Sequence, residues 1–133
     1  MSRTQSVVSW TLQLVVAAIL LQTLFFKFTG AEESVYIFRA VGAEPWGRIG
    51  SGVLELMAAT MLLVPALSAY GAILTLGLMS GAIMSHLTIL GVEVMDDRGL
   101  LFSLALAAFT GSLMVLVLRR SQVPLARYLG LAV

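Results

Sequence analysis

The sequence predicts an all-α fold, an integral membrane four-helix up-down bundle with a short interfacial helix in the first loop. The composition is the first observation behind this prediction: 59% of the 133 residues are hydrophobic, 11% are charged, and the mean hydropathy is +1.00. Soluble domains carry about 45–50% apolar and about 25% charged residues, so too few charges remain here to cover a globular surface. The second observation is that four long apolar segments follow one another along the chain.

We expect the four spans at about residues 7–28, 49–64, 70–90 and 100–118, which make residues 1–133 a single transmembrane domain. A helix needs about 20 mostly apolar residues to cross the hydrocarbon core. Pro65 should end the second span, because proline does not continue a helix, and Gly91 should cap the third. The connecting loops are short, which favours antiparallel neighbours. We expect the first span to be retained, because its apolar stretch is long for a signal peptide and carries Lys27 near its end.

The first loop, residues 29–48, is the longest and has structure of its own. Apolar and polar residues between Val35 and Val41 alternate as in a short amphipathic helix that lies in the membrane interface. The stretch Glu44-Pro45-Trp46-Gly47 then predicts a turn with an interfacial tryptophan.

The distribution of basic residues favours an orientation with both termini in the cytoplasm. Four spans place the termini on one side, which carries four arginines and no acidic residue: Arg3, Arg119, Arg120 and Arg127. The opposite side carries six acidic residues, but acidic residues contribute little to orientation. Cytoplasmic loops are enriched in Lys and Arg, so the dense arginine group near the C-terminus decides the prediction.

The composition also excludes several kinds of chemistry. Cysteine is absent, so no disulfide, thiolate nucleophile or thiol-ligated metal can form. The net charge of +1 argues against a nucleic-acid partner. One histidine and no cysteine also make a transition-metal site unexpected, and we predict no metal ligand.

Small residues recur at every fourth position in the third and fourth spans. The two series are Gly77, Gly81, Ser85 and Ser103, Ala107, Gly111. Small residues at this spacing allow the backbones of membrane helices to approach closely. We therefore expect spans three and four to pack tightly along these residues.

Three ionisable residues lie inside the spans: Lys27, Glu55 and His86. Such residues usually face the interior of a bundle and are candidates for function. Lys27 ends span one, Glu55 lies roughly 10 Å inside span two at 1.5 Å per residue, and His86 is one turn from the end of span three. The topology brings all three towards the outer leaflet. They are the principal predicted ligand-binding residues, and no catalytic residue is predicted.

Each of these residues also has a structural interpretation. Lys27 could extend its ammonium group to the interface, and His86 could be a core histidine bonded to a carbonyl. Glu55 lies too deep to remain without a partner or a proton, so an ion pair of Glu55 with Lys27 or His86 that only fixes the helix register fits equally well.

Three further residues complete the predicted ligand-binding set. Arg48 shares the Glu55 side of span two. Asp96 and Asp97 follow His86 and could cover the site, or they could belong to a solvated loop before a helix start at Gly99.

Three short motifs resemble the DoxX-like family of small four-helix bacterial membrane proteins, and the resemblance covers nearly the whole chain. They are Phe26-Lys27-Phe28-Thr29-Gly30, Gly52-Val53-Leu54-Glu55-Leu56 and Ala82-Ile83-Met84-Ser85-His86. The resemblance implies a multi-pass protein of the bacterial cytoplasmic (inner) membrane with its polar residues near one membrane face. It also implies a link to quinol oxidation, thiosulfate metabolism, oxidative-stress complexes or assembly.

The expected function is that of an accessory subunit in a membrane redox complex that binds a quinone or a similar lipophilic headgroup at the outer leaflet. Its partners would be the lipid bilayer and a membrane redox or assembly protein. No covalently bound cofactor is expected, and we expect no catalytic activity of the chain on its own. The alternative is an assembly or scaffolding subunit in which the buried Lys, Glu and His only hold the bundle together. A transporter or channel is disfavoured, because no midspan break or ring of pore charges is present.

Overall fold

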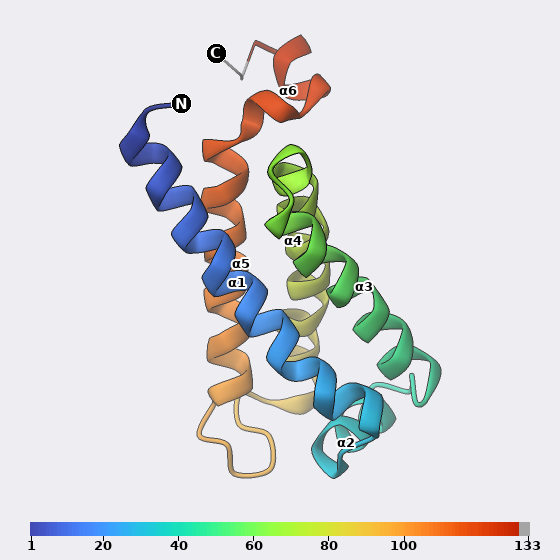
Figure 1. Cartoon of the computed structure of the whole chain (residues 1–133). Coiled ribbons are helices and arrows are strands. Elements are labelled where there is room, and N and C mark those ends of the chain that lie inside the picture. The colour runs from blue at the N-terminus through green and yellow to red at the C-terminus, as the bar shows by residue number, and fades with distance from the viewer. Residues whose placement is uncertain (131–133) are drawn as a thin grey trace.

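A computed structural model describes residues 1–130, and within them the secondary structure is entirely helical (Figure 1). Four long helices form the bundle: α1 (Arg3–Thr29), α3 (Trp46–Leu63), α4 (Ser68–Ser85) and α5 (Leu100–Leu118). Five short elements connect or extend them: α2 (Glu32–Ala40), the 3-10 turn η1 (Pro65–Leu67), the π-helical turn η2 (His86–Leu90), the 3-10 turn η3 (Arg120–Gln122) and α6 (Pro124–Tyr128).

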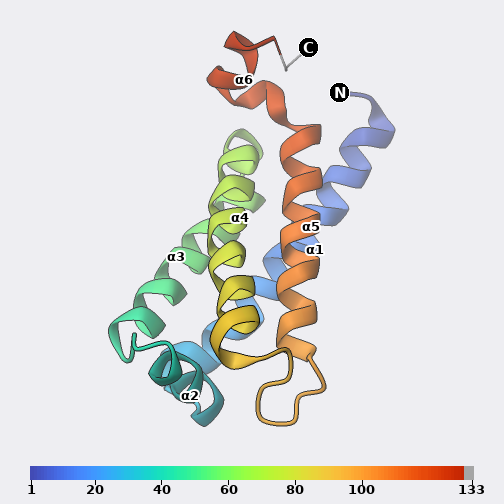
Figure 2. The ribbon, with the colours of Figure 1, turned by 180° about the vertical axis from the view of Figure 1, so that it is seen from behind.

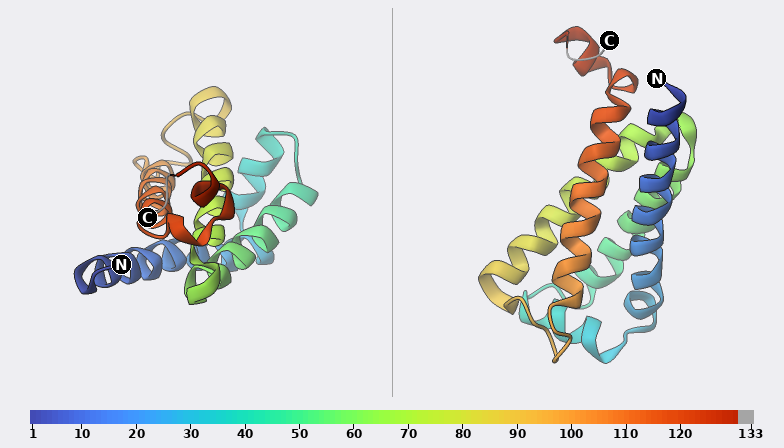
Figure 3. Two further views of the ribbon diagram at one scale, coloured as in Figure 1. Left: turned by 90° about the horizontal axis from the view of Figure 1, so that it is seen from above. Right: turned by 90° about the vertical axis from the view of Figure 1, so that its left-hand side faces the viewer.

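Each long helix packs extensively against the next one in the chain, and α5 returns to pack against α1. Both ends of the described chain lie at one end of the bundle together with η1, whereas α2 and the 91–99 loop lie at the opposite end (Figures 1 and 2). The predicted up-down bundle is therefore confirmed. The further views show α1 inclined relative to α5 (Figure 3).

The ends of α1 have clear local causes. Ser2 caps its N-terminus: the Ser2 hydroxyl accepts from the Gln5 amide, and the Gln5 side chain accepts from the Ser2 amide in return. This capping box satisfies two donors that a helix start leaves free. At the other end Gly30 adopts the left-handed conformation, with φ 69°, that favours glycine.

Within residues 1–130, three helices are long and apolar enough to cross a membrane: α1, the continuous segment Pro65–Leu90 and α5. The chain is thus a multi-pass membrane protein with helices that contact lipid. The expected second span is present as α3 but is less apolar, because its 18 residues include Arg48 and Glu55. Those two residues belong to the polar end of the bundle described below.

The helix boundaries differ from the predicted ones in four places. α1 begins at Arg3, because the Ser2 cap extends it before the apolar stretch. α3 begins at Trp46, which is 72% exposed and lies in the first helical turn and not within the preceding turn. The third span ends its α-helical part at Ser85 and continues as the π-helical η2, which Gly91 terminates as expected. The interfacial helix α2 is confirmed, although it starts earlier, at Glu32.

The prediction for the small-residue series was wrong in its details. α4 and α5 do pack together, but a Cβ atom on Gly77 or Gly81 would meet no atom within 4 Å. Ser103 and Ala107 are exposed. Of the three glycines in the two series, Gly111 alone makes a close approach, and its neighbour is Val16 of α1, 2.8 Å from an added Cβ. Regular small residues suit the wall of a cavity as well as a helix contact, so the spacing alone did not distinguish the two.

A buried polar network closes the bundle near its termini. Arg119 is 9% exposed, and its Nε–H lies 2.8 Å from Ser9 Oγ and 2.9 Å from Gln13 Oε1. The Gln13 amide in turn donates to the Leu62 carbonyl at 2.6 Å and lies 3.1 Å from Ser68 Oγ. Three of the four long helices and the end of α5 thus share one set of hydrogen bonds. Arg119 was expected among the cytoplasmic charges, but it lies inside the protein.

Candidate functional site

A cavity of about 670 Å³ occupies the opposite end of the bundle. Residues of α1, α2, α3, α4, η2, the 91–99 loop and α5 line it. Much of its wall is apolar, with side chains such as Leu20, Phe26, Phe38, Leu78 and Leu101. Gly77 and Gly81 also line it, so the absence of two side chains from α4 provides part of its space.

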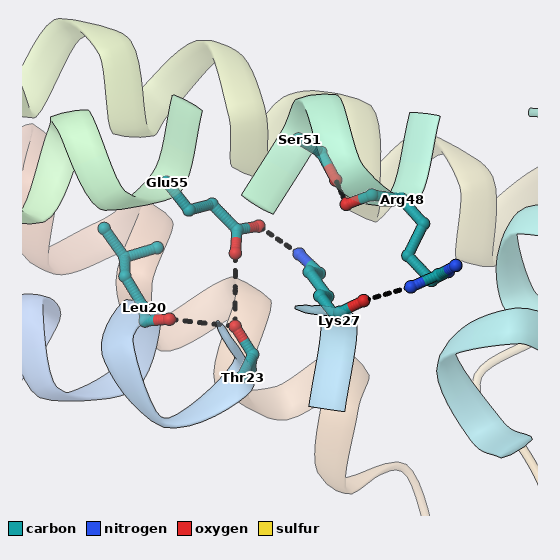
Figure 4. Close-up of polar contacts among 6 residues, drawn as sticks. All are labelled: Leu20, Thr23, Lys27, Arg48, Ser51 and Glu55. Carbon is teal, nitrogen blue, oxygen red and sulfur yellow. Dashed lines mark hydrogen bonds and ion pairs between the residues drawn. The ribbon is translucent and has the colours of Figure 1, made fainter. Parts of the chain in front are cut away.

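One wall carries an ion pair between α1 and α3. The Lys27 ammonium group is bonded to Glu55 Oε1, and the Thr23 hydroxyl lies 3.1 Å from Glu55 Oε2 (Figure 4). The Thr23 hydroxyl also lies 2.9 Å from the Leu20 carbonyl, so its one proton has two acceptors. Glu55 is 4% exposed, and both of its oxygens have partners. The predicted juxtaposition of Lys27 and Glu55 is therefore present.

Arg48 lies next to this ion pair and does not line the cavity. Its Nε–H lies 2.9 and 3.0 Å from the two carboxylate oxygens of Glu44, and its terminal NH group donates to the Lys27 carbonyl (Figure 4). The last carbonyls of a helix have no partner within the helix, and Arg48 satisfies one of them. Its role in the structure is to join the end of α1 to the start of α3.

His86 lies on the opposite wall, at the start of η2, and is 5% exposed. Its Nδ1 is 2.9 Å from the carbonyl oxygen of Gly91, and its ring lies 5.5 Å from that of Phe102. A carbonyl only accepts, so Nδ1 must carry a proton. Single π-helical turns within α-helices are often found at functional sites. Here the turn brings the Gly91 carbonyl to the histidine five residues before it.

The two aspartates of the 91–99 loop have different positions. Asp97 lines the cavity and accepts from the backbone amides of Val94, Gly99 and Leu101 at 3.0, 2.8 and 3.1 Å. Asp96 is exposed and is not among the lining residues. Burial alone would raise the pKa of Asp97, but the three amide donors and the nearby His86 bring that pKa below the ordinary 3.8. Asp97 therefore both caps the start of α5 and faces the cavity.

Glu33 belongs to the cavity wall and was not predicted. It lies in the first turn of α2, and burial together with the charge of Asp97 raises its pKa above the ordinary 4.5. The sequence placed the start of the interfacial helix near Val35, which left Glu33 in a loop. The adjacent pair Glu32-Glu33 was an available signal, because acidic residues are favoured in the first turn of a helix.

The arrangement combines an apolar interior with polar groups on facing walls. Lys27, Glu55 and Thr23 come from α1 and α3, whereas His86 and Asp97 come from η2 and the following loop. Within residues 1–130, no group of three or more His, Asp or Glu side chains could hold a metal ion. Such a cavity suits a lipophilic molecule whose polar atoms form hydrogen bonds at its edges.

The carboxylate of Asp97 gives a prediction for stability against pH. Its lowered pKa means that Asp97 stabilises the folded state above pH 3.8 and loses this contribution as the pH falls through its folded-state pKa. Asp97→Asn should lower the unfolding free energy in detergent by about 0.5–1.5 kcal/mol near pH 7, because Asn has one acceptor oxygen and no charge where the carboxylate serves three backbone amides. The difference from the parent should shrink at lower pH. Asp96→Asn is the control and should change little; a gap for Asp97→Asn that does not depend on pH would contradict this assignment.

Comparison with known proteins adds one positive finding. No curated protein and no solved structure matches the chain. A model of the DoxX-like family matches residues 11–112, which include Lys27, Glu55 and His86. This match spans most of the bundle, from the first half of α1 to Ser112 in α5, and agrees with the resemblance of the three motifs. The chain belongs to the DoxX-like family.

Proposed function

We propose that this protein binds a quinone or a similar lipophilic headgroup in the cavity beside Lys27, Glu55 and His86, and that it acts as an accessory subunit of a membrane redox complex. The observation that carries the proposal is the cavity itself, about 670 Å³ in volume, with an apolar interior and polar groups on facing walls. Pockets for small lipophilic ligands are typically about 300–1,000 Å³ and combine apolar walls with a few polar groups.

The chemistry of the lining residues supports this class of ligand. A quinone ring carries two oxygens on opposite edges, and the cavity offers hydrogen-bonding groups on opposite walls. Glu33 and Asp97 also line the cavity, at the end of the bundle that we place at the outer face. A quinone carries its own redox chemistry, so the protein needs to supply only binding and orientation. Electrons would pass to a partner protein, hence the proposed role as an accessory subunit.

A second candidate function rests on the contacts between α1 and α3. The Lys27–Glu55 ion pair and the bond from Arg48 to the Lys27 carbonyl join the two helices directly. An assembly or scaffolding subunit would need no more than this. The two functions differ in what they require of Glu55, because a scaffold needs only its charge as a partner for Lys27.

A double-mutant cycle separates the two functions. Glu55→Gln should leave Lys27 without a counter-ion and lower the unfolding free energy by about 1–3 kcal/mol. Fully buried ion pairs lose about 3–5 kcal/mol, but the Lys27 side chain keeps 16% exposure. Adding Lys27→Met should restore most of the stability, since no unpaired charge remains. Thermal unfolding in detergent measures both steps and their coupling.

Ligand content provides the second measurement of the same cycle. We expect the stable double variant to co-purify with less quinone than the parent, as measured by mass spectrometry after mild detergent extraction. A double variant with the parent's stability and the parent's quinone content would show that the pair only holds the helices together.

Filling the cavity tests the proposed function without touching an ionisable group. A side chain on Gly81 would enter open space, so Gly81→Leu should fold normally and occupy part of the cavity. We expect it to reduce co-purifying quinone by about ten-fold or more, since overpacking costs a ligand about 1–3 kcal/mol. Gly50→Leu is the matched control, because Gly50 is also exposed on a helix with nothing within 4 Å but does not line the cavity. Equal quinone content in the two variants would show that the quinone does not bind in this cavity.

We also propose that the protein lies in the bacterial cytoplasmic (inner) membrane with its termini in the cytoplasm, which places the cavity towards the outer leaflet. Arg3, Arg120 and Arg127 support this orientation after Arg119 is set aside as buried. The two ends can be labelled selectively, because the chain has no cysteine. In intact cells a membrane-impermeant maleimide should react with an Ala40→Cys variant and not with a Ser121→Cys variant, both at exposed positions.

The reverse labelling pattern would place the cavity in the cytoplasmic leaflet. Permeabilised cells serve as the control, in which both cysteine variants should react. Ser34 is unsuitable as the reporter position, because it is only 8% exposed and would be protected in either orientation.

A further inference from the structure

His86 lines the cavity, and one of its two ring nitrogens has no hydrogen-bond partner within residues 1–130. Its Nδ1 is engaged with the Gly91 carbonyl at 2.9 Å, and no bond to Nε2 occurs within residues 1–130. Among these residues, the one side-chain polar atom that is both fully enclosed and unpartnered is Ser112 Oγ. Nε2 is therefore not fully enclosed, although His86 as a whole is only 5% exposed, and the residue lines the cavity.

The bond to Gly91 determines what Nε2 can do. Because Nδ1 carries a proton, Nε2 of the neutral ring has a lone pair and no hydrogen, whereas both nitrogens of the protonated ring donate; the acceptor role belongs to the neutral ring. A hydrogen-bond donor on the ligand, such as a hydroxyl group, would pair with this nitrogen. A carbonyl oxygen in the same position would place one lone pair against another. An unsatisfied acceptor in a largely buried site is unfavourable, so the ligand's functional group matters.

The other charged groups at the cavity do not supply the missing donor. Lys27 is committed to Glu55, and that pair belongs to the wall formed by α1 and α3. Asp97 in the following loop interacts electrostatically with His86, and Glu33 on α2 interacts with Asp97. Asp97 is itself an acceptor for three backbone amides. The side of the cavity around His86 is therefore rich in acceptors.

The geometry points to a site that prefers the hydroxyl-bearing form of its lipophilic ligand, with His86 Nε2 accepting a hydrogen bond from that hydroxyl. This inference rests on the proposed function and adds the chemical class of the ligand: a phenol or hydroquinone headgroup and not the corresponding quinone. His86 is then the residue that determines this specificity. The hydrogen bond from Nδ1 to the Gly91 carbonyl is what makes Nε2 the accepting nitrogen.

Three matched probes test the preference on the purified full chain: a decyl-substituted benzoquinone, the corresponding hydroquinone, and the dimethyl ether of that hydroquinone. We expect the hydroquinone to bind about ten-fold or more tightly than the other two, the factor that one satisfied hydrogen bond in a buried site produces. The dimethyl ether keeps the size and the apolar ring but has no donor. It thus separates hydrogen bonding from ring chemistry.

Variants of His86 assign the preference to Nε2. His86→Leu removes the acceptor and should bind all three probes with similar affinity. His86→Gln is a second variant whose amide both donates and accepts, so the preference should fall towards unity while polarity is kept. Thr88→Val is the control within the same turn, because Thr88 is exposed, bonds to the Met84 carbonyl and does not line the cavity. It should keep the parent's preference.

The outcomes distinguish this inference from the proposed function. If none of the probes binds the parent more tightly than it binds Gly81→Leu, the proposed function and the inference both fail. If all three bind the parent's cavity with equal affinity, or the quinone binds most tightly, the proposed function stands and the role of Nε2 as an acceptor is wrong. A hydroquinone preference that His86→Gln leaves unchanged would place the acceptor elsewhere on the wall.

Discussion

The need to neutralise the Glu55 carboxylate constrains the architecture of the candidate site. A charged carboxylate in the interior of a membrane protein requires a partner, and the last turns of α1 provide Lys27 and Thr23. This pairing requires α1 and α3 to lie against each other at their α2 ends. Arg48 strengthens the same junction through the Lys27 carbonyl. With α1 held to α3, the space bounded by α4 and α5 is left open at this end, and the cavity occupies it.

Polar groups are arranged differently at the two ends of the bundle. Near the termini, Arg119 donates to Ser9 and Gln13, and Gln13 in turn bonds to Ser68 of α4. Gly71 allows the backbones of α3 and α4 to approach closely in the same half of the bundle. At the other end, polar groups line the cavity, and one ring nitrogen of His86 has no hydrogen bond within residues 1–130. Buried polar groups are nearly always paired, so the unpaired nitrogen is the more informative observation.

Much of this arrangement could be predicted from the sequence. Apolar stretches and short loops gave the four helices and their order, and the depth of Glu55 required a partner such as Lys27. Contacts that depend on helix rotation and inclination could not be predicted. Arg119 was expected to be solvated because its neighbours are charged, but the rotation of α5 turns it towards Ser9 and Gln13. To predict that Glu33 lines the cavity, one needs the correct start of α2. To predict the same of Gly77 and Gly81, one needs to know which face of α4 meets open space.

The closed terminal end also limits the routes by which a molecule can reach the cavity. Between the cavity and the termini, the middle of the bundle is filled by fully buried residues such as Val16, Ala58, Leu62 and Ala108, and the Gln13–Arg119 network lies beyond them. Within residues 1–130 the cavity is therefore closed towards the terminal end of the bundle. A quinone bound there as proposed would have no route through the terminal end, so it would exchange with the half of the membrane that holds the cavity, and a proton that it released would go to that side. The two ends of the fold are therefore not equivalent: buried side chains close the end that holds the termini, and the other end holds the cavity.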